Sequence, residues 1–430
     1  MPQYEGYKDS GTAWLGNIPS TWETGVIGAL YTLRNTKVSD TEYPPLSVTM
    51  KGIVPQLETA AKTDAHDARK LVLKGDFAIN SRSDRRGSCG ISDYDGSVSL
   101  INTVLTPRGK MNPQYYNWMF HTVQFADEFY KNGHGIVDDL WTTCWNEMKR
   151  ILIPVPSLEE QAGIADYLEN KIAHIDSVIA EAKASIEEYK AWKASIIYEV
   201  VTKGLDPNVT MKDSGIEWIG DMPFKWELVP FRYVLSERNE KNNPVVSTER
   251  LSLSIDLGVT LYADKTTNLD RLKEDFSQYK IAHEGDLVMN SMNMIVGASG
   301  VSSWFGCVSP AYYTFYDTET DHVTAKFCEY IFRNKAMLRV LHSMGKGIYS
   351  IDRGDDRVNT CRLKVSKDEL KSLLIPIPPI EEQREIVQYL TDKCNAISAL
   401  ISEKEALIAD LDAYKRSLIF EVATGKRKVV

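Results

Sequence analysis

The amino-acid sequence predicts an α+β protein in which two similar globular domains alternate with two long, antiparallel coiled-coil helices, as a pseudo-twofold tandem duplication. One observation is that residues 7–23 recur at residues 211–227. A second is a pair of long heptad patterns, and a third is a set of short strand patterns before each of them. At about 100–200 residues per domain, the 430 residues suffice for about two to four domains.

The repeat extends along the whole chain and keeps its order. The openings read YKDSGTAWLGNIPSTWE (7–23) and MKDSGIEWIGDMPFKWE (211–227), and ILIPVPSLEEQ (151–161) recurs as LLIPIPPIEEQ (373–383). The offset grows from 204 residues (211 − 7) to 222 residues (373 − 151), so the second copy contains insertions. A shared framework with different loops is typical of one scaffold that presents two surfaces. We predict two globular domains and two spacer helices, in the chain order 1–153, 154–204, 205–375 and 376–430.

Each globular region is rich in β-branched and aromatic residues, interrupted by glycine, asparagine and aspartate. Short strands are predicted at residues 44–49, 77–80 and 96–101, and helical stretches at 113–130 and 325–344. We expect a compact, mostly antiparallel α+β domain.

The region after each globular domain has apolar residues that alternate spacings of three and four over about four heptads. A helix of roughly 40 residues is about 60 Å long, too long to bury its apolar stripe on one domain. We therefore expect each helix to pair with its copy. Antiparallel pairing fits best, because the domain between the helices can carry the chain back. The residues predicted to pair the helices are Leu168, Ile172, Ile175, Ile179, Ile186, Tyr189, Leu390, Ile397, Ile401, Ile408 and Leu411.

The sequence contains no motif that predicts a catalytic centre, a cofactor site or a metal site. We find no GxxxxGK[ST], no GxGxxG that opens a helix, no HExxH and no CxxC pair. Glu42-Tyr43-Pro44-Pro45-Leu46 comes nearest to an amino-methyltransferase motif, but it lacks the polar residue before the prolines and the aromatic residue after them. The net charge of −9 disfavours a uniformly basic nucleic-acid binder, although it leaves room for a local basic surface.

Nothing in the sequence predicts export or a membrane span. No run of about 18 apolar residues occurs, and the first residues lack the basic and then apolar order of a secretory signal. The six cysteines are scattered, which disfavours a disulfide framework. These observations predict a soluble, cytoplasmic protein.

The duplicated layout resembles the DNA specificity subunits of type I restriction-modification enzymes over essentially the whole chain. The motifs that carry the resemblance are Trp14-x-Gly16-x-x-Pro19-x-x-Trp22, its copy from Trp218 to Trp226, and two Ile-Pro-x-Pro-x-x-Glu-Glu-Gln helix starts. The resemblance implies two target-recognition domains, each of which reads one half of a split double-stranded DNA target. It also implies that the paired helices act as a spacer and that this subunit is not catalytic.

The resemblance further implies partners and cofactors outside this chain. Two methyltransferase subunits would dock around the helices, bind S-adenosylmethionine and methylate adenines. Restriction and translocase subunits would use ATP and Mg. Two alternatives remain open from the sequence: a coiled-coil adaptor for proteins without DNA specificity, and a fused restriction or modification enzyme.

Four segments, together with Lys51, Arg353 and Arg357, carry the candidate DNA contacts. Residues 80–87 (NSRSDRRG) offer arginine for guanine, asparagine for adenine, and serine or arginine for phosphates, although a solvated turn is the alternative. Residues 290–295 (NSMNMI) keep the asparagine and serine without arginine, so they predict either different base contacts or a shared structural turn. The glycine loops at 133–135 and 345–347 predict phosphate contacts or tight turns. The candidate residues are Lys51, Asn80, Ser81, Arg82, Ser83, Arg85, Arg86, His134, Asn290, Ser291, Asn293, Lys346, Arg353 and Arg357.

Overall fold

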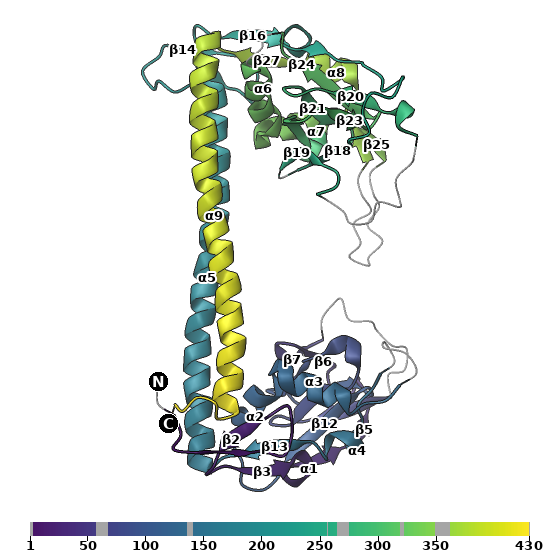
Figure 1. The fold of residues 1–430 in the computed structure, drawn as a ribbon, viewed down its shortest axis with the longest axis vertical. Helices are drawn as coiled ribbons and strands as arrows, with labels where there is room; N and C mark the ends of the chain where they lie inside the picture. The colour runs from purple at the N-terminus through teal and green to yellow at the C-terminus, as the bar shows by residue number, and fades with distance from the viewer. Residues whose placement is uncertain are drawn as a thin grey trace. The chain divides into compact units, whose positions relative to one another are not determined.

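The computed structural model describes residues 3–56, 68–135, 141–255, 257–264, 275–318, 322–348 and 362–429. The chain forms two compact units (Figure 1). Unit 1 comprises residues 1–183 and 404–430, and unit 2 comprises residues 184–403. Each unit contains one repeated globular region and part of both long helices. The division between the units falls inside the two long helices and not at the domain boundaries expected from the sequence. It does not test those boundaries, which remain predictions.

The globular region of unit 1 is built from short strands and a few short helices. A four-stranded sheet has the order β10-β9-β12-β4, and a three-stranded sheet has the order β11-β8-β5. The strands are β1 (Tyr7–Asp9), β2 (Asn17–Pro19), β3 (Glu23–Val26), β4 (Tyr31–Arg34), β5 (Lys37–Val38), β6 (Leu46–Thr49), β7 (Gly52–Pro55), β8 (Arg69–Val72), β9 (Phe77–Asn80), β10 (Cys89–Ile91), β11 (Gly96–Ser99), β12 (Asn102–Pro107) and β13 (Leu152–Val155). The helices are α1 (Ile27–Leu30), η1 (Ser83–Arg85), α2 (Pro113–Phe120), α3 (Val123–Lys131) and α4 (Trp145–Met148).

The globular region of unit 2 repeats this plan with the sheet order β17-β24-β21-β22. Its strands are β14 (Met211–Asp213), β15 (Asp221–Pro223), β16 (Glu227–Pro230), β17 (Ser236–Glu237), β18 (Leu251–Ser254), β19 (Gly258–Leu261), β20 (Lys280–Ala282), β21 (Leu287–Asn290), β22 (Ser299–Val301), β23 (Gly306–Val308), β24 (Tyr312–Tyr316), β25 (Lys346–Ile348), β26 (Arg362–Lys364) and β27 (Leu374–Ile377). Its helices are η3 (Phe231–Tyr233), η5 (Phe276–Gln278), η6 (Met294–Val296), α6 (Val323–Arg333), α7 (Lys335–Met344) and α8 (Lys367–Ser372).

The described strand pairs are antiparallel, as the sequence predicts. Local chemistry shortens several predicted elements. Each predicted helical stretch is two helices, because Thr122 caps α3 through its Oγ1 atom, 3.2 Å from Phe125 N, and Asn334 caps α7 through its Oδ1 atom, 2.7 Å from Ala336 N. The strand predicted at 44–49 begins only at Leu46, and the strand predicted at 96–101 ends at Ser99.

A buried ion pair occupies the same place in both copies. The Arg34 Nε atom lies 2.6 Å from Asp76 Oδ2, and the Arg238 Nε atom lies 2.6 Å from Asp286 Oδ2. Each arginine makes a second hydrogen bond to the other oxygen of the same carboxylate. Each aspartate directly precedes the central strand β9 or β21, so the pair fixes where that strand begins. The two copies thus share their framework down to single side chains.

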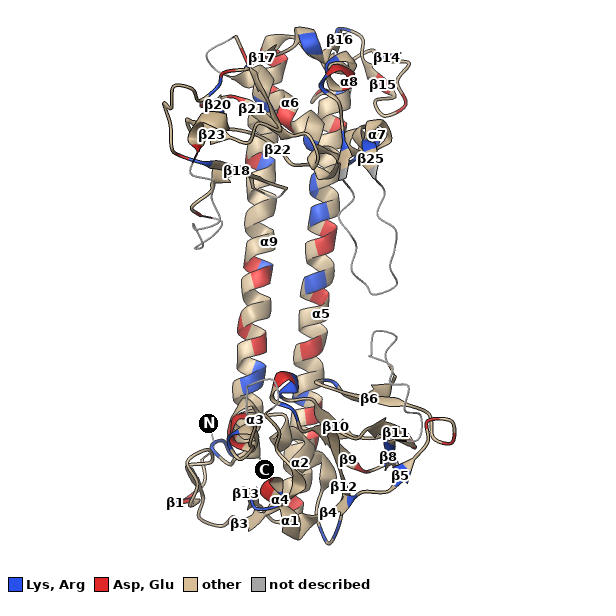
Figure 2. Ribbon diagram, turned by 90° about the vertical axis from the view of Figure 1, so that its right-hand side faces the viewer, with Lys and Arg blue, Asp and Glu red and all other residues tan. Residues whose placement is uncertain are grey.

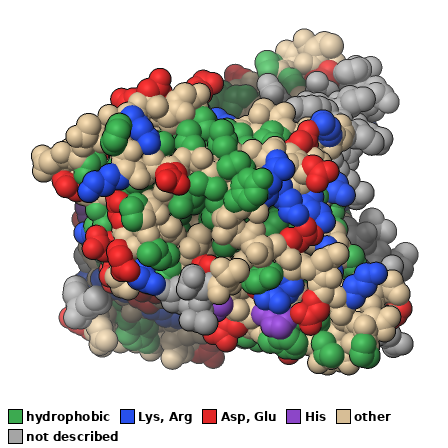
Figure 3. All heavy atoms as spheres, turned by 90° about the horizontal axis from the view of Figure 1, so that it is seen from above, with side chains coloured by type: hydrophobic (Ala, Val, Ile, Leu, Met, Phe, Trp, Pro, Cys, Tyr) green, Lys and Arg blue, Asp and Glu red, His purple; other side chains and the backbone are tan. Residues whose placement is uncertain are grey.

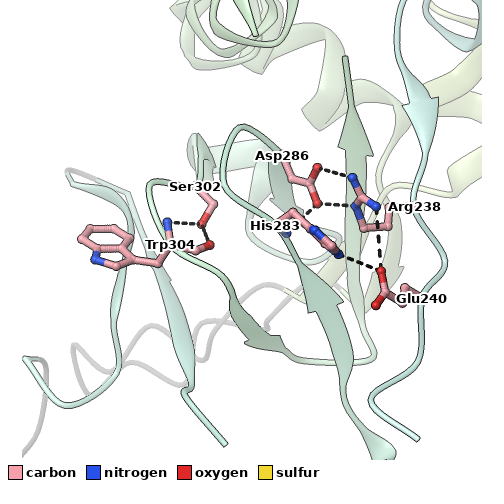
Figure 4. Close-up of polar contacts among 6 residues, drawn as sticks. All are labelled: Arg238, Glu240, His283, Asp286, Ser302 and Trp304. Atoms are coloured by element: carbon pink, nitrogen blue, oxygen red, sulfur yellow. Dashed lines mark hydrogen bonds and ion pairs between the residues drawn. The ribbon is translucent and has the colours of Figure 1, made fainter. Parts of the chain in front are cut away.

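Figure 4 shows how polar contacts surround this pair in unit 2. Asp286 Oδ2 also accepts a hydrogen bond from the backbone N–H of His283, at 2.8 Å. The His283 ring lies 2.8 Å from Glu240 Oε2. On the neighbouring turn, the Ser302 hydroxyl donates to the carbonyl of Trp304 at 2.8 Å. Such local bonds hold the turns at the end of the sheet rigid.

The two long helices are α5 (Leu158–Lys203, 46 residues) and α9 (Ile380–Ala423, 44 residues). Both present basic and acidic residues along their lengths (Figure 2). In unit 1, Lys415 Nζ lies 2.5 Å from Asp176 Oδ1, and in unit 2, Lys193 Nζ donates to Ser398 Oγ at 2.8 Å. The second contact lies seventeen residues further along α5 (193 − 176) and seventeen residues earlier along α9 (415 − 398). The helices are therefore paired antiparallel, as the sequence predicts.

The residues assigned to helix pairing lie on the inner faces of these helices. The buried ones are Leu168, Ile172, Ile175, Ile179, Ile186, Leu390 and Ile397, and the half-buried ones are Tyr189, Ile401, Ile408 and Leu411. In unit 1 the first part of α5 and the last part of α9 join one core with the aromatic residues of the globular region. In unit 2 the last turns of α5 and the first turns of α9 do the same.

The end of each long helix packs against the tryptophan of a repeat opening. Gly204 follows α5 with φ of 76°, and Gly425 follows α9 with φ of 73°, a conformation that glycine adopts without strain. A Cβ atom at Gly204 would lie 3.3 Å from Trp226 Cζ2. One at Gly425 would lie 3.0 Å from Trp22 Cη2 and 2.6 Å from Pro19 Cγ. The buried Trp22 and Trp226 are thus part of the framework.

We expect the polar contacts between the helices to contribute little to stability. The Asp176 side chain is 52% exposed, and exposed ion pairs contribute about 1 kcal/mol at most. Asp176→Asn should therefore lower the free energy of unfolding by no more than about 1 kcal/mol in urea titrations. The matched change Ile175→Val, which removes one buried methyl group from the same turn, should cost about 0.5–1.5 kcal/mol. A larger cost for Asp176→Asn than for Ile175→Val would contradict a seam held together by apolar packing.

Among the described helices, none offers the stretch of apolar sequence that a bilayer crossing requires.

Candidate nucleic-acid interface

The strongest candidate surface is the turn of residues 81–87, which we call the arginine turn. It joins β9 to β10 and contains the short helix η1. Asn80 Oδ1 accepts a hydrogen bond from Arg82 N at 3.0 Å, and Gly87, with φ of 72°, reverses the chain. This geometry leaves Arg82, Arg85 and Arg86 exposed on one turn. Three guanidinium groups with five donors each can bind phosphates or the edges of guanine.

Two of these arginines are held by weak, exposed partners. Arg86 Nη1 lies 2.8 Å from Asp127 Oδ1, and its guanidinium lies 5.4 Å from the centre of the Tyr130 ring. Arg85 Nε lies 3.5 Å from Asp84 Oδ2. Exposed ion pairs are worth about 1 kcal/mol or less, so a phosphate or a base can displace them. A hollow next to the turn is lined by Arg86 and its neighbours, namely Ser83, Asp84, Asp127, Tyr130, Lys131 and Trp141.

Burial raises the pKa of Tyr130, which keeps its hydroxyl neutral. That hydroxyl donates to the Asn80 carbonyl at 3.2 Å. Because the Tyr130 ring also contacts the Arg86 guanidinium, it connects helix α3 to the arginine turn.

The structure brings the first glycine loop next to the arginine turn. His134 and Thr142 exchange two backbone hydrogen bonds of 3.0 Å, and Arg82 pairs with Thr142 as well. Ser83 N donates to Trp141 O at 3.1 Å. Residues 141–143 therefore join the exposed His134 to the arginines. Sequence reasoning missed Trp141, which has no counterpart in the motifs that recur between the copies.

Lys51 also lies on this side of the domain. It occupies the tip of the β6–β7 hairpin and is exposed. A Cβ atom on Gly90 of β10 would lie 2.7 Å from Gly52 Cα, so the hairpin tip rests directly on the strand that follows the arginine turn. The four cations Lys51, Arg82, Arg85 and Arg86 thus belong to neighbouring loops.

Asn80 and Ser81 lie in the interior rather than on this surface. Both are buried, and the Ser81 hydroxyl lies 3.0 Å from Thr103 Oγ1. Their copies Asn290 and Ser291 are buried too, and Asn290 Oδ1 accepts from Met292 N at 3.1 Å, as Asn80 Oδ1 does from Arg82 N. A side chain that shapes its own turn in the interior cannot reach a base edge. The structure therefore favours the structural alternative for these four residues.

The matching turn of unit 2 has a different surface. Val365 N donates to Ser291 O at 3.1 Å, just as Thr143 N donates to Ser81 O at 3.0 Å, so the framework of the two turns is the same. Asn293 is exposed in this turn. Lys346 is exposed at the start of β25, where its Nζ atom lies 2.6 Å from Glu369 Oε1. Arg353 and Arg357, which were also predicted to contact DNA, lie outside the described residues.

The chain as a whole is acidic, with 59 aspartate and glutamate residues against 50 lysine and arginine residues. On the face that Figure 3 shows, basic and acidic side chains are interspersed around a central group of hydrophobic ones. This mixture accords with the net charge of −9. Recognition of an anion therefore depends on particular loops and not on the total charge.

We expect Gly133→Ala to disturb the interface without unfolding unit 1. The new Cβ would lie 2.7 Å from Thr143 Oγ1 and 2.9 Å from Thr142 O, which forces residues 141–143 to move. Overpacking of this kind costs about 1–3 kcal/mol. Hydrogen exchange should become faster at the amides of Ser83 and Thr143, which bond within this segment. The control variant Gly345→Ala crowds Leu363 in unit 2 and should leave those amides unchanged.

Comparison with known proteins shows which proteins this chain is similar to. The model described as "Type I restriction modification DNA specificity domain" matches residues 313–409. Two proteins of Methanocaldococcus jannaschii are similar over nearly their whole length. The putative type I restriction enzyme MjaX specificity subunit is 21% identical over 451 residues, with 96% of each chain covered. The type I restriction enzyme MjaVIII specificity subunit is 23% identical over 438 residues, with 96% of this chain and 94% of that one covered.

Two solved structures have the same fold. One, described as the structural basis of complex assembly and conformational transition of the type I R-M system, aligns with a TM-score of 0.66 at 14% identity, covering 94% of this chain and 98% of that one. The other is the HsdS subunit from Thermoanaerobacter tengcongensis, with a TM-score of 0.53 at 16% identity, covering 95% of this chain and 98% of that one.

Proposed function

We propose that the chain, which is similar to type I restriction-modification DNA specificity subunits, is a noncatalytic subunit that reads a bipartite DNA target. Each unit recognises one half of the target. The subunit thereby directs adenine methylation and DNA restriction that its partner subunits carry out.

The observation that carries this proposal is one framework with two different turns. The ion pairs Arg34–Asp76 and Arg238–Asp286 have the same geometry, and the turns that follow β9 and β21 make equivalent backbone contacts. The exposed side chains of these turns nevertheless differ, since only the first carries arginines. A duplicated scaffold that keeps its framework and varies these side chains suits two readers of two different sequences.

The proposed contacts to DNA lie on the candidate surface, where all of them except the half-buried Ser83 are exposed. In unit 1 they are Lys51, Arg82, Ser83, Arg85, Arg86 and His134, and in unit 2 they are Asn293 and Lys346. Arginine forks onto the O6 and N7 atoms of guanine, whereas lysine binds phosphates as a compact charge and histidine can donate a ring N–H to them. Contacts to phosphates fix the position of the protein on the duplex, and contacts to base edges give it specificity.

The proposed partners supply the chemistry that the sequence motifs of this chain do not predict. Two methyltransferase subunits bind S-adenosylmethionine and methylate adenines that are flipped out of the duplex. Restriction and translocase subunits use ATP and Mg to move and cut DNA. A similar fold in a structure of type I R-M complex assembly supports a role within such a complex. With partners that also bind DNA, an acidic chain need not neutralise the phosphates alone.

A gel shift with the reconstituted methyltransferase complex tests this proposal. The target is first identified by sequencing methylated adenines in cells that carry the complex. A duplex with this target should then bind at least about a thousandfold more tightly than random duplex at one fixed salt concentration. Equal binding of target and random duplex would support a protein adaptor instead. Methylation by the isolated chain would show that it is itself an enzyme.

A further inference from the structure

The turn of unit 2 exposes apolar side chains where that of unit 1 exposes cations. Met292 and Val296 of this turn are 37% and 47% exposed, and Ile255 and Leu257 at the tip of the β18–β19 hairpin are 50% and 76% exposed. The hairpin and the turn are neighbours, because a Cβ atom on Gly297 would lie 4.0 Å from Ile255 Cγ2. We call these four residues the apolar patch. Single exposed apolar residues are ordinary, but a contiguous group marks a binding surface.

The duplication aligns four cations of unit 1 with apolar residues of unit 2, of which all but the buried Ile295 are exposed. Gly87 and Gly297 fix an offset of 210 residues in the turn, and Gly52 and Gly258 fix one of 206 residues in the hairpin. These hairpin glycines rest on equivalent strands. A Cβ atom on Gly90 would lie 2.7 Å from the Cα atom of Gly52, and a Cβ atom on Gly300 would lie 2.9 Å from the Cα atom of Gly258. The resulting pairs are Lys51 with Leu257, Arg82 with Met292, Arg85 with Ile295 and Arg86 with Val296.

These exchanges change which part of DNA each surface can bind. An apolar side chain cannot bond to a phosphate or to the polar edge of a base. In the major groove, the C5-methyl group of thymine is the apolar group that such a side chain can cover. The exposed Asn293 of the same turn carries an amide, which forks onto the N6 and N7 atoms of adenine. The surface of unit 2 therefore matches the two bases of an A·T pair.

We infer that unit 2 recognises A·T pairs in its half of the target, with thymine methyl groups packed against Met292, Val296 and Leu257. The arginine turn of unit 1 recognises guanine in the other half. The inference deepens the proposed function and rests on it. DNA is the occupant that the duplication favours over a protein, because the apolar patch stands on the same framework positions as the cationic surface of unit 1.

Replacing thymine by deoxyuridine tests the inference without altering the protein. Deoxyuridine pairs as thymine does but lacks the C5-methyl group. The target is identified from methylated DNA, and the half assigned to unit 2 is the one whose recognition survives replacement of Arg82, Arg85 and Arg86. In the complete methyltransferase complex, deoxyuridine at a contacted thymine should weaken binding about fourfold, the effect of exposing one buried methyl group. Deoxyuridine in the half read by unit 1 is the matched control and should change binding less than twofold, roughly.

A pair of protein variants provides the second arm. Met292→Ala with Val296→Ala should weaken binding to the thymine target and remove the difference between thymine and deoxyuridine. Met50→Ala, at the exposed tip of the β6–β7 hairpin of unit 1, is the control and should preserve that difference.

Three outcomes overturn the inference, and they differ in what they say about the proposed function. If the complex prefers its target but deoxyuridine has no effect in either half, the methyl groups are not read, while the proposed function stands. If the Met292 and Val296 variant fails to assemble with the methyltransferase subunits and deoxyuridine has no effect, the apolar patch binds protein. If the complex has no preferred target at all, the proposed function fails as well.

Discussion

Replacing Arg82, Arg85 and Arg86 together by alanine should abolish recognition of one half of the target while leaving assembly intact. These three side chains are exposed on one turn, and their ion pairs with Asp84 and Asp127 are exposed as well. Each arginine that forks onto a guanine contributes about 1–3 kcal/mol of discrimination. We therefore expect the preference for the correct half-site to fall by at least about 3 kcal/mol, which is more than a hundredfold.

The measurement is competition binding by the methyltransferase complex, with duplexes that carry changes in one half of the target only. The triple variant should bind correct and altered sequences of its own half equally, and it should still reject changes in the other half. The control variant replaces Lys110 and Arg150, which are exposed cations of the same unit outside this surface. It should keep both preferences.

The salt dependence separates base contacts from phosphate contacts. Each lost phosphate contact reduces the slope of log K against log salt by about 0.9. If the triple variant weakens binding equally for all sequences and reduces the slope by about three, the arginines bind phosphates and do not read bases. If methylation of the native target is unchanged, the arginine turn is not part of the interface.

The helical part of the fold is predictable because its information is local and periodic. A heptad pattern fixes which residues of a helix face a partner, so Leu168 and Ile172 could be placed in a buried seam from sequence alone. The antiparallel sense follows from the position of a globular domain between the two helices. The breaks at Thr122 and Asn334 are also local, but a capping side chain in an amphipathic stretch resembles any other polar residue.

The candidate surface is less predictable because it depends on contacts between distant residues. Lys51 approaches the arginine turn only through the packing of Gly52 on Gly90, and His134 does so through residues 141–143. Asn80 shows that residue type alone does not identify a contact to DNA. An asparagine after a strand fits both a base contact and a turn that it shapes itself, and only its burial distinguishes the two.

The central claim is that the paired helices set the distance between the two halves of the target. The most direct test is to insert one heptad into α5 after Lys183 and one into α9 after Glu403. In the antiparallel register given by the Asp176–Lys415 and Lys193–Ser398 contacts, Lys183 lies opposite Ile408 (176 + 415 − 183 = 408), five residues from Glu403 (408 − 403 = 5). Seven residues preserve the apolar seam and add about 10 Å of helix, which corresponds to about three base pairs.

Sequencing of methylated DNA from cells that carry the variant complex gives the result directly. We expect both half-sites to stay the same and the gap between them to grow by about three base pairs. A heptad inserted into α5 alone is the control, and it should abolish target preference because the seam beyond the insertion loses its register. An unchanged gap in the doubly extended protein would contradict the claim that the helices space the two readers.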